Sequence, residues 1–200
     1  MDLNTRENRA ILISGFSELA ADPSFKINSP ESKEYNCIAW AMGFDDRWVD
    51  PEDADYIHKK WWPEGVERSL EPEVLISAFK KLGFERCEDG CYVSDFDKVA
   101  LYKGRYYNKL TGLFEEKIVW THAAKIVGNN LYHSKIGESF DIYHSGRDLF
   151  RGTMYGTVYS YMQRSKANRI YTEKEKNKQV ILPNDEAKER MIRQILEYMS

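Results

Sequence analysis

The chain has 200 residues, of which 42% are hydrophobic and 14% aromatic, enough apolar sequence for one globular domain with a substantial core. This composition excludes a disordered protein. The formal net charge is −3 and no basic stripe dominates, so nothing indicates a nucleic-acid partner.

Three cysteines are an odd number, which does not suit a complete set of disulfides. Near the start of the chain the apolar run is residues 10–13, too short for an export signal or a membrane span. We therefore expect a cytoplasmic protein, or one exported by a signal-less secretion system, with no membrane partner. Its cysteines should be free, catalytic or metal-bound.

The first elements lead to a cysteine. Helical spacing of apolar residues predicts a helix over residues 5–19, followed by a loop that reaches Asn36. Cys37 then begins a short apolar helical segment that ends at Gly43. A thiol in the first turn of a helix faces unpaired backbone N–H groups, which favour the nucleophilic thiolate. The alternative is a small buried core cysteine.

Residues 44–68 are irregular and rich in tryptophan. A loop of this length usually covers a site or has a function of its own. We expect Trp61 and Trp62, with Asn36, to contact a substrate. The alternative is that the tryptophans pack on the core as a lid.

The remaining sequence alternates one helix with several strands. A helix is predicted over residues 72–82, a strand and turn over 84–92, a polar excursion over 103–116, and a charged connection over 164–179. Strands are predicted over residues 99–102, 118–124 and 131–136, with extensions at 140–143 and 156–161. Gly128-Asn129-Asn130 predicts a hairpin turn. Pro183-Asn184-Asp185 predicts the start of a C-terminal amphipathic helix.

A helix-borne thiol needs a base, and His122 is the best candidate. Its neighbours in Thr121-His122-Ala123-Ala124 are small and leave space beside the imidazole. A third polar group usually orients such an imidazole. Ser134 is the expected third residue, with His133 or Asp141 as alternatives.

These segments resemble the NlpC-like branch of the papain-like clan of cysteine hydrolases. The resemblance rests on Tyr35-Asn36-Cys37, on the strand at 99–102, and on residues 122–134 with their Gly-Asn turn. It implies an α+β fold with N-terminal helices packed on an antiparallel sheet, Cys37 as nucleophile, His122 as base, and Ser134 or His133 as the orienting group. The chain departs from the family pattern in having Asn36 where Asp is usual and Ile38-Ala39 where Ser-Gly is usual.

A second resemblance is to a group of uncharacterised bacterial proteins. They share segments of the types Asn-Cys-Ile-Ala-Trp-Ala, Thr-His-Ala-Ala and Ser-Lys-x-Gly, the last being residues 134–137 here. The resemblance covers residues 34–161 and implies no particular activity.

A metal site is the rival interpretation of the same residue types. Two thiolates and several imidazoles can form a tetrahedral zinc site. The residues concerned would be Cys87, Cys91, His122, His133 and His144.

We therefore expect a papain-like α+β domain over residues 1–163, followed over 164–200 by the charged connection and the C-terminal helix. The expected function is a thiol hydrolase that cleaves an amide bond (peptide, isopeptide, glutamine side chain or cell-wall peptide) through an acyl-thioenzyme, without cofactor or metal. Its partners would be a peptide or protein substrate and, if it is a bacterial toxin or effector, an immunity protein. The alternatives are a non-enzymatic binding or immunity protein on the same fold and a zinc-stabilised domain.

Overall fold

The structure is a computed structural model that describes residues 2–52, 60–108, 111–146, 149–151 and 153–169. The described sheet and helices belong to one compact unit, Met1–Arg169. The C-terminal helix predicted from residue 183 onward lies outside the described residues.

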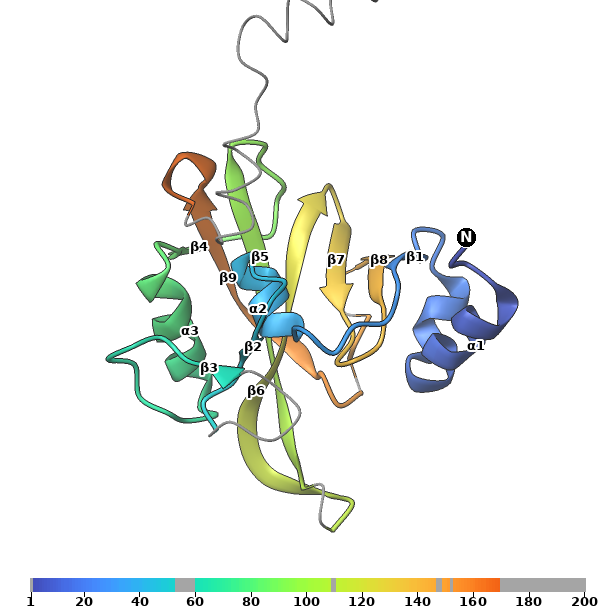
Figure 1. Cartoon of the computed structure of the whole chain (residues 1–200), viewed down its shortest axis with the longest axis horizontal. Coiled ribbons are helices and arrows are strands. Elements are labelled where there is room, and N and C mark those ends of the chain that lie inside the picture. The colour runs from blue at the N-terminus through green and yellow to red at the C-terminus, as the bar shows by residue number, and fades with distance from the viewer. Residues whose placement is uncertain (1, 53–59, 109–110, 147–148, 152, 170–200) are drawn as a thin grey trace, which may run out of the picture. The chain divides into compact units, whose positions relative to one another are not determined.

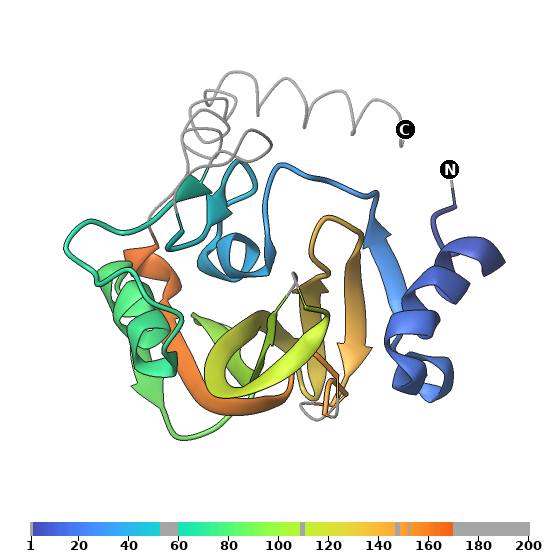
Figure 2. The same cartoon turned by 90° about the horizontal axis from the view of Figure 1, so that it is seen from below.

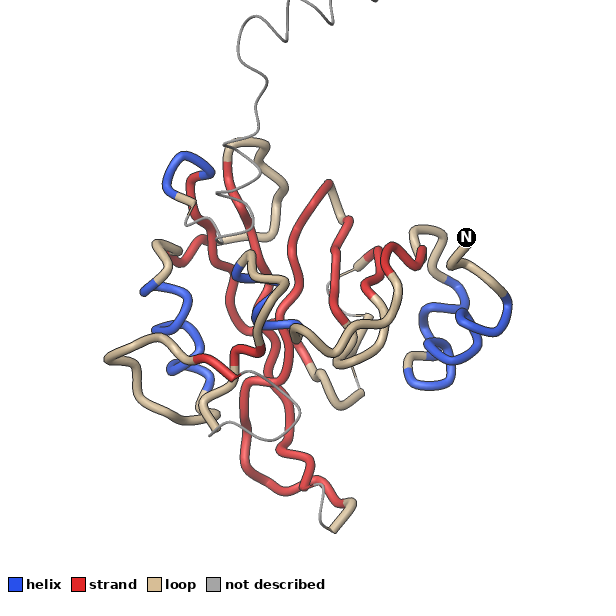
Figure 3. The backbone as a smooth tube through the Cα atoms, viewed as in Figure 1, coloured by secondary structure: helices blue, strands red, loops and turns tan. Residues whose placement is uncertain are grey.

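A seven-stranded sheet organises the first unit (Figures 1 and 3). The strand order is β1-β8-β7-β6-β5-β9-β4, and every neighbouring pair is antiparallel. The strands are β1 (Lys26–Ser29), β4 (Glu85–Cys87), β5 (Phe96–Asn108), β6 (Leu113–Gly128), β7 (Leu131–Lys135), β8 (Asp141–Ser145) and β9 (Thr157–Ser165). Two short strands, β2 (Trp48–Val49) and β3 (Lys60–Trp61), pair in parallel apart from the large sheet.

Short turns join β5, β6, β7 and β8 into an antiparallel meander. The turn predicted at residues 128–130 is confirmed: Gly128 pairs with Leu131, and Asn130 adopts the left-handed conformation at φ 52°. Strand β9 then pairs with the other edge of β5. Just before β9, the backbone at Gly156 passes very close to the backbone of β5. A Cβ at Gly156 would lie 2.1 Å from the Lys103 carbonyl oxygen, so a glycine is required there.

Among the described residues, three α-helices and one 3-10 helix precede β5; the helix Cys37–Met42 lies over the sheet and the others lie beside its two sides (Figure 2). These are α1 (Arg6–Gly15), η1 (Ser17–Ala21), α2 (Cys37–Met42) and α3 (Pro72–Lys81). A second 3-10 helix, η2 (Lys166–Asn168), follows β9. The predicted packing of the Cys37 helix on an antiparallel sheet is confirmed by the contacts of α2 with β6 and β7.

The two faces of the sheet carry separate cores. Val99, Leu101 and Ala123 belong to a first core shared with α2 and α3, whereas their neighbours Ala100 and Ala124 belong to a second core shared with α1 and η1. Successive side chains of a strand point to opposite faces, so this division follows from the strand period. We call the side of the first core the α2 face and the side of the second core the α1 face.

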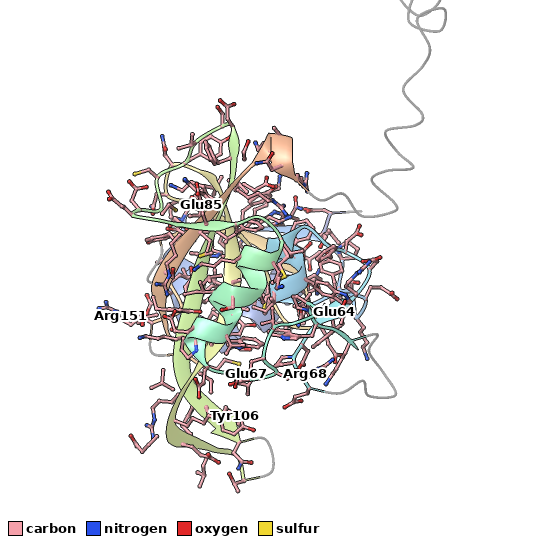
Figure 4. The ribbon with its side chains drawn as sticks, turned by 90° about the vertical axis from the view of Figure 1, so that its left-hand side faces the viewer. Glu64, Glu67, Arg68, Glu85, Tyr106 and Arg151 are labelled. Atoms are coloured by element: carbon pink, nitrogen blue, oxygen red, sulfur yellow. The ribbon has the colours of Figure 1, made fainter. Side chains whose placement is uncertain are left out.

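Several local predictions were wrong. Residues 103–116 are not an excursion, because β5 and β6 continue through most of them and form an arm that extends past the other strands (Figure 1). Figure 4 shows Tyr106 on this arm and away from α3. By contrast, the strand predicted within residues 84–92 is present as β4, which pairs with β9.

The expected exposed connection is wrong at its start. Arg164 belongs to β9 and is 2% exposed, with its guanidinium bonded to the Leu82 carbonyl and to Asp97. A buried cation with hydrogen-bonded partners is a structural element. The expected domain limit at 163 therefore falls inside a strand, and the compact unit runs to Arg169.

Candidate functional site: a buried thiol beside a histidine–serine–histidine chain

Helix α2 holds Cys37 at its first position, and Asn36 fixes that position. The Asn36 Oδ1 accepts hydrogen bonds from the Ala39 N–H at 2.9 Å and the Val49 N–H at 3.3 Å, while its Nδ2 donates to the Val49 carbonyl at 2.9 Å. Gly43 closes the helix in the left-handed conformation. Asn36 is therefore a helix cap that also anchors β2, and the expectation that it contacts a substrate has no support from these bonds.

Cys37 lies where β6 and β7 part. The ladder between these strands covers Lys125, Ile126 and Gly128 of β6 and does not reach Ala123. The Ala123 backbone instead forms a hydrogen bond to the thiol, as do the N–H groups of Cys37 itself and of Ile38. The thiol thus contacts the backbone of the residue that directly follows His122.

Burial decides the protonation of this thiol. Cys37 is 8% exposed, and burial raises its pKa to about 11, although the three backbone hydrogen bonds and the nearby Lys135 oppose that rise. The expectation of a thiolate stabilised by the helix start is therefore wrong for this conformation. Cys37 is a protonated thiol at neutral pH.

His122 is fully buried on β6, opposite Tyr102 of β5. Its ring stacks on Tyr155, with centroids 4.1 Å apart and an interplanar angle of 7°, and meets Phe150 edge-on at 5.1 Å. These aromatic neighbours place the imidazole on the α1 face. Burial and the neighbouring His144 hold its pKa well below the usual value, so the ring is neutral.

Ser134 joins His122 to a second histidine. The Ser134 Oγ lies 3.1 Å from His122 Nε2 and 2.8 Å from His144 Nε2. On its other side, His144 Nδ1 lies 3.4 Å from the Ser145 carbonyl oxygen. Among the described residues, no group forms a hydrogen bond to His122 Nδ1, and that includes Cys37.

The two alternatives for the third residue lie elsewhere. His133 pairs with Lys125 on the α2 face, stacks on Tyr143 at 4.3 Å, and meets the edge of Trp40 at 4.9 Å. Asp141 accepts a hydrogen bond from the Tyr35 hydroxyl at 2.7 Å. Of the three candidates, the structure brings Ser134 to His122.

A second buried polar group lies on the thiol side of the sheet. Lys135 is fully buried, donates to the Ser139 carbonyl, and lies over the Tyr35 ring at 5.3 Å. Burial lowers its pKa, and the nearby Asp141 carboxylate acts against that shift. Lys135 is also one of the groups that act to lower the pKa of the Cys37 thiol.

The tryptophans are packing residues. Trp62 is 7% exposed, stacks on Trp120 at 6.4 Å, and donates its indole N–H to the Glu67 carbonyl. Trp61 is half-buried against Phe44. The lid alternative describes Trp62 better than a substrate groove does.

The metal alternative lacks a set of ligands. Within the described part of the chain, no group of three or more His, Cys, Asp or Glu side chains is arranged to hold a metal ion. Cys87 ends β4 at one edge of the sheet, whereas the histidines lie on β6, β7 and β8.

Sequence reasoning missed His144 as a partner of Ser134, and it missed Lys135 and Tyr155. His144 reaches Ser134 because β7 and β8 pair with Ser134 opposite Ile142, which sets His144 diagonally across the ladder. The signal available in the sequence was a histidine ten residues beyond a serine, and that spacing is informative only once the register is known.

The fold and these contacts define an α+β domain with a cysteine, two histidines and a serine gathered around its central strand. The chain belongs to the family described as Domain of unknown function (DUF7689), whose model matches residues 26–163. The matched range includes all four of these residues and leaves out α1 and η1. No curated protein and no solved structure matches the sequence. No helix among the described residues is long and apolar enough to cross a membrane.

Proposed function

We propose that this domain is a papain-like thiol hydrolase that cleaves an amide bond, with Cys37 as nucleophile, His122 as base and Ser134 as the orienting group. One observation carries the proposal: the buried chain of His122, Ser134 and His144 ends in a ring nitrogen without a hydrogen-bond partner among the described residues, and His122 directly precedes Ala123, whose backbone bonds to the thiol. Burying three polar side chains costs more than an apolar core would, and such departures from core packing are typical of functional sites.

The reaction starts from a neutral pair. Cys37 belongs to the core of the α2 face and the His122 ring lies on the α1 face, so the reaction requires the two groups to meet in the gap where β6 and β7 part. There the thiol sulfur attacks the amide carbonyl while its proton passes to His122 Nδ1, and the same proton then passes to the leaving nitrogen as the C–N bond breaks. Water adds to the thioester, gives a proton to Nδ1, and releases the acid as the C–S bond breaks and the sulfur is protonated again. Hydrogen bonds between catalytic groups often tighten only when substrate is bound.

Charge stabilisation comes from groups already in contact with the sulfur. The backbones of Cys37, Ile38 and Ala123 and the nearby Lys135 all act to lower the pKa of the thiol, so they favour negative charge on the sulfur. Donors fixed before reaction stabilise charge that develops on sulfur and on the carbonyl oxygen. Because burial opposes a standing thiolate, this stabilisation matters most in the transition state.

The substrates that fit this chemistry are a peptide, an isopeptide, a glutamine side chain or a cell-wall peptide. A toxin or effector of bacterial origin, paired with an immunity protein, would use the same chemistry. The test measures release of amine or ammonia from casein, a glutamine-containing peptide and purified muropeptides, with wild type and the Cys37→Ala variant.

We expect one of these substrates to be cleaved and Cys37→Ala to lose at least about 1,000-fold in turnover, by analogy with the loss of other covalent nucleophiles. Cys91→Ala is the matched control, because Cys91 is exposed and should leave turnover unchanged. The melting temperature of Cys37→Ala should stay close to that of wild type. Cleavage that survives in Cys37→Ala rejects the proposal.

A second candidate function is a binding protein that keeps the fold without catalysis. The specific observation in its favour is the 8% exposure of Cys37 together with a pKa of about 11. A peptide aldehyde distinguishes the two, because a working nucleophile forms a thiohemiacetal with it. A folded wild-type protein that forms no adduct and cleaves no substrate supports the binding protein.

A further inference from the structure

The geometry points to His144 as a positioning residue that sets which nitrogen of His122 carries the proton. This inference rests on the proposed role of His122 as base and deepens it. The contacts form one chain: Ser145 carbonyl, His144, Ser134, His122. Each contact has a direction, and the directions follow from the chemistry of the groups.

The chain begins at a group that can only accept. The Ser145 carbonyl has no proton, so His144 Nδ1, which lies 3.4 Å from it, is the protonated nitrogen. His144 is fully buried, and burial lowers its pKa to about 4, so the ring is neutral and carries one proton. His144 Nε2 is therefore a lone pair.

The hydrogen-bond direction at His144 determines the direction of the bond between Ser134 and His122. Facing a lone pair at 2.8 Å, the Ser134 hydroxyl donates its hydrogen to His144 Nε2. Its oxygen then accepts from the other histidine at 3.1 Å, which requires a proton on His122 Nε2. His122 is also neutral, so Nδ1 carries the lone pair, as a base for the thiol needs.

The opposite direction is less favourable at both ends. It would place a proton on His122 Nδ1, which has no acceptor among the described residues in a fully buried site. It would also set the lone pair of His144 Nδ1 against the Ser145 carbonyl oxygen. A buried donor without an acceptor is costly, so the first direction should dominate.

The ring of His122 cannot easily turn over to exchange its two nitrogens. Tyr155 stacks on one face at 4.1 Å, and Phe150 and Tyr102 meet the ring at 5.1 Å and 5.4 Å. His144 is likewise stacked on Tyr132 and meets Phe150 edge-on. Packing therefore holds both rings while the hydrogen bonds choose the tautomer.

The experiment is a long-range proton–nitrogen NMR correlation on uniformly ¹⁵N-labelled protein, which separates protonated from unprotonated ring nitrogens. In wild type we expect His122 to carry its proton on Nε2. In His144→Leu the serine hydroxyl loses its acceptor and turns to donate to His122 Nε2, so we expect the proton to move to Nδ1. In His144→Gln an amide oxygen replaces the accepting nitrogen, and the wild-type tautomer should be kept.

His133→Leu is the matched control, because His133 is also a buried histidine, lies on the neighbouring strand, and makes no described bond to Ser134 or His122. It should leave the His122 tautomer unchanged. Ser134→Ala provides a second, smaller change and should leave His122 as a mixture of tautomers. In an amide-cleavage assay, His144→Leu should lower kcat about 10- to 100-fold with KM unchanged, and His144→Gln should restore most of it.

The NMR measurement tests the inference about His144, and the activity measurement tests the proposed hydrolase, so either can be rejected without the other. A wild-type His122 protonated on Nδ1, or a tautomer that does not respond to His144→Leu, overturns the inference whatever the activity. That wild-type measurement needs no variant to fold. A tautomer that responds as expected in a protein whose amide cleavage survives Cys37→Ala supports the inference about His144 and rejects the hydrolase.

Discussion

Burial sets the charge of the cysteine and histidine side chains of the site in the same direction. It raises the pKa of the Cys37 thiol and lowers the pKa of His122, His133 and His144, so all four are neutral near pH 7. A thiolate–imidazolium pair, the usual resting form of an activated cysteine, is therefore disfavoured in this conformation. Two measurable properties should follow from this burial: the rates at which the cysteines react, and the stability of the protein in acid.

Alkylation of the three cysteines should follow exposure and not catalytic role. We expect iodoacetamide at pH ~7.5 to modify Cys91 first, Cys87 more slowly and Cys37 slowest, because Cys91 is exposed and burial raises the pKa of the other two. Mass spectrometry of peptides over time measures the rates. In guanidinium chloride the three rates should converge; fastest modification of Cys37 in the folded protein would contradict this prediction.

Acid should destabilise the protein through its buried histidines. His133 and His144 have pKa values of about 4 in the folded state, against about 6.5 when unfolded, so the unfolded chain takes up protons first as the pH falls. Stability is then lost from about pH 6.5 down to pH 4, by about 2–3 kcal/mol per histidine at pH 4. Asp141 has the opposite effect on the free energy of unfolding: burial raises its pKa, so the folded protein takes up this proton before the unfolded chain does as the pH falls.

The measurement is the melting temperature of wild type at intervals from neutral pH down to about pH 4, with His144→Gln for comparison. We expect a steady fall in wild type and a shallower fall in the variant, which has one buried histidine fewer. A melting temperature that stays constant over this range is the opposing result.

Helix α2 is six residues long, too short to be stable without its neighbours. Its position depends on Asn36, which caps the helix and holds β2 through three hydrogen bonds. The same side chain therefore connects the first turn of α2, where the thiol lies, to the tryptophan-rich segment.

Replacing Asn36 should weaken this connection in a graded way. We expect Asn36→Ala to lower stability by about 2–3 kcal/mol, because it removes the cap and leaves Val49 backbone groups without their partner. Asn36→Ser keeps a capping oxygen but is too short to serve Val49, so its loss should be about half as large. Urea unfolding measures both; equal stability of Asn36→Ala and wild type would show that the cap is dispensable.

The elements that the sequence predicts well are those whose pattern is local. Gly43 and Gly83 mark helix ends, and the Gly128 turn marks a hairpin, because each needs a particular backbone conformation. The arm of β5 and β6 was missed because none of its described side chains from residue 103 to 116 is buried, and exposed apolar residues such as Leu113 and Phe114 interrupt its polar ones. Strand β1 was missed because it is only four residues long, with a single buried residue, Ile27, between polar ones.

The site divides in the same manner. Cys37, His122 and Ser134 stand out by residue type and spacing, whereas the contact of His144 with Ser134 depends on the register of β7 with β8. The raised pKa of Cys37 also could not be read from its helix position, because it depends on how strands far apart in sequence cover the thiol.

At the scale of the whole molecule, the distribution of metal-binding side chains across the sheet leads to a prediction about zinc. Cys87 lies on β4, an edge strand, and β9, β5 and β6 separate it from the strands that carry His133 and His144. A structural zinc would contribute folding energy directly, so its removal would lower the melting temperature.

We therefore expect EDTA to leave the melting temperature unchanged and the purified protein to contain less than about 0.1 zinc per chain by mass spectrometry, since structural sites are occupied stoichiometrically. Cys87→Ser with Cys91→Ser should retain the wild-type melting temperature to within about 2 °C, because Cys91 is exposed and Cys87 lies outside the buried core. One zinc per chain, with unfolding on chelation, would restore the metal interpretation.

The meander of β5 to β8 has a consequence for the order in which the molecule can assemble. His122, Ser134 and His144 all lie on strands joined by short turns, so their contacts close small loops and can form early. Cys37 comes from a helix far earlier in the chain than His122, and β9 must return over β5 from later in the chain. In this order of assembly, His122, Ser134 and His144 contact one another before Cys37 packs against the sheet. The Cys37 thiol and the His122 imidazole would therefore come together only when the last long-range contacts form.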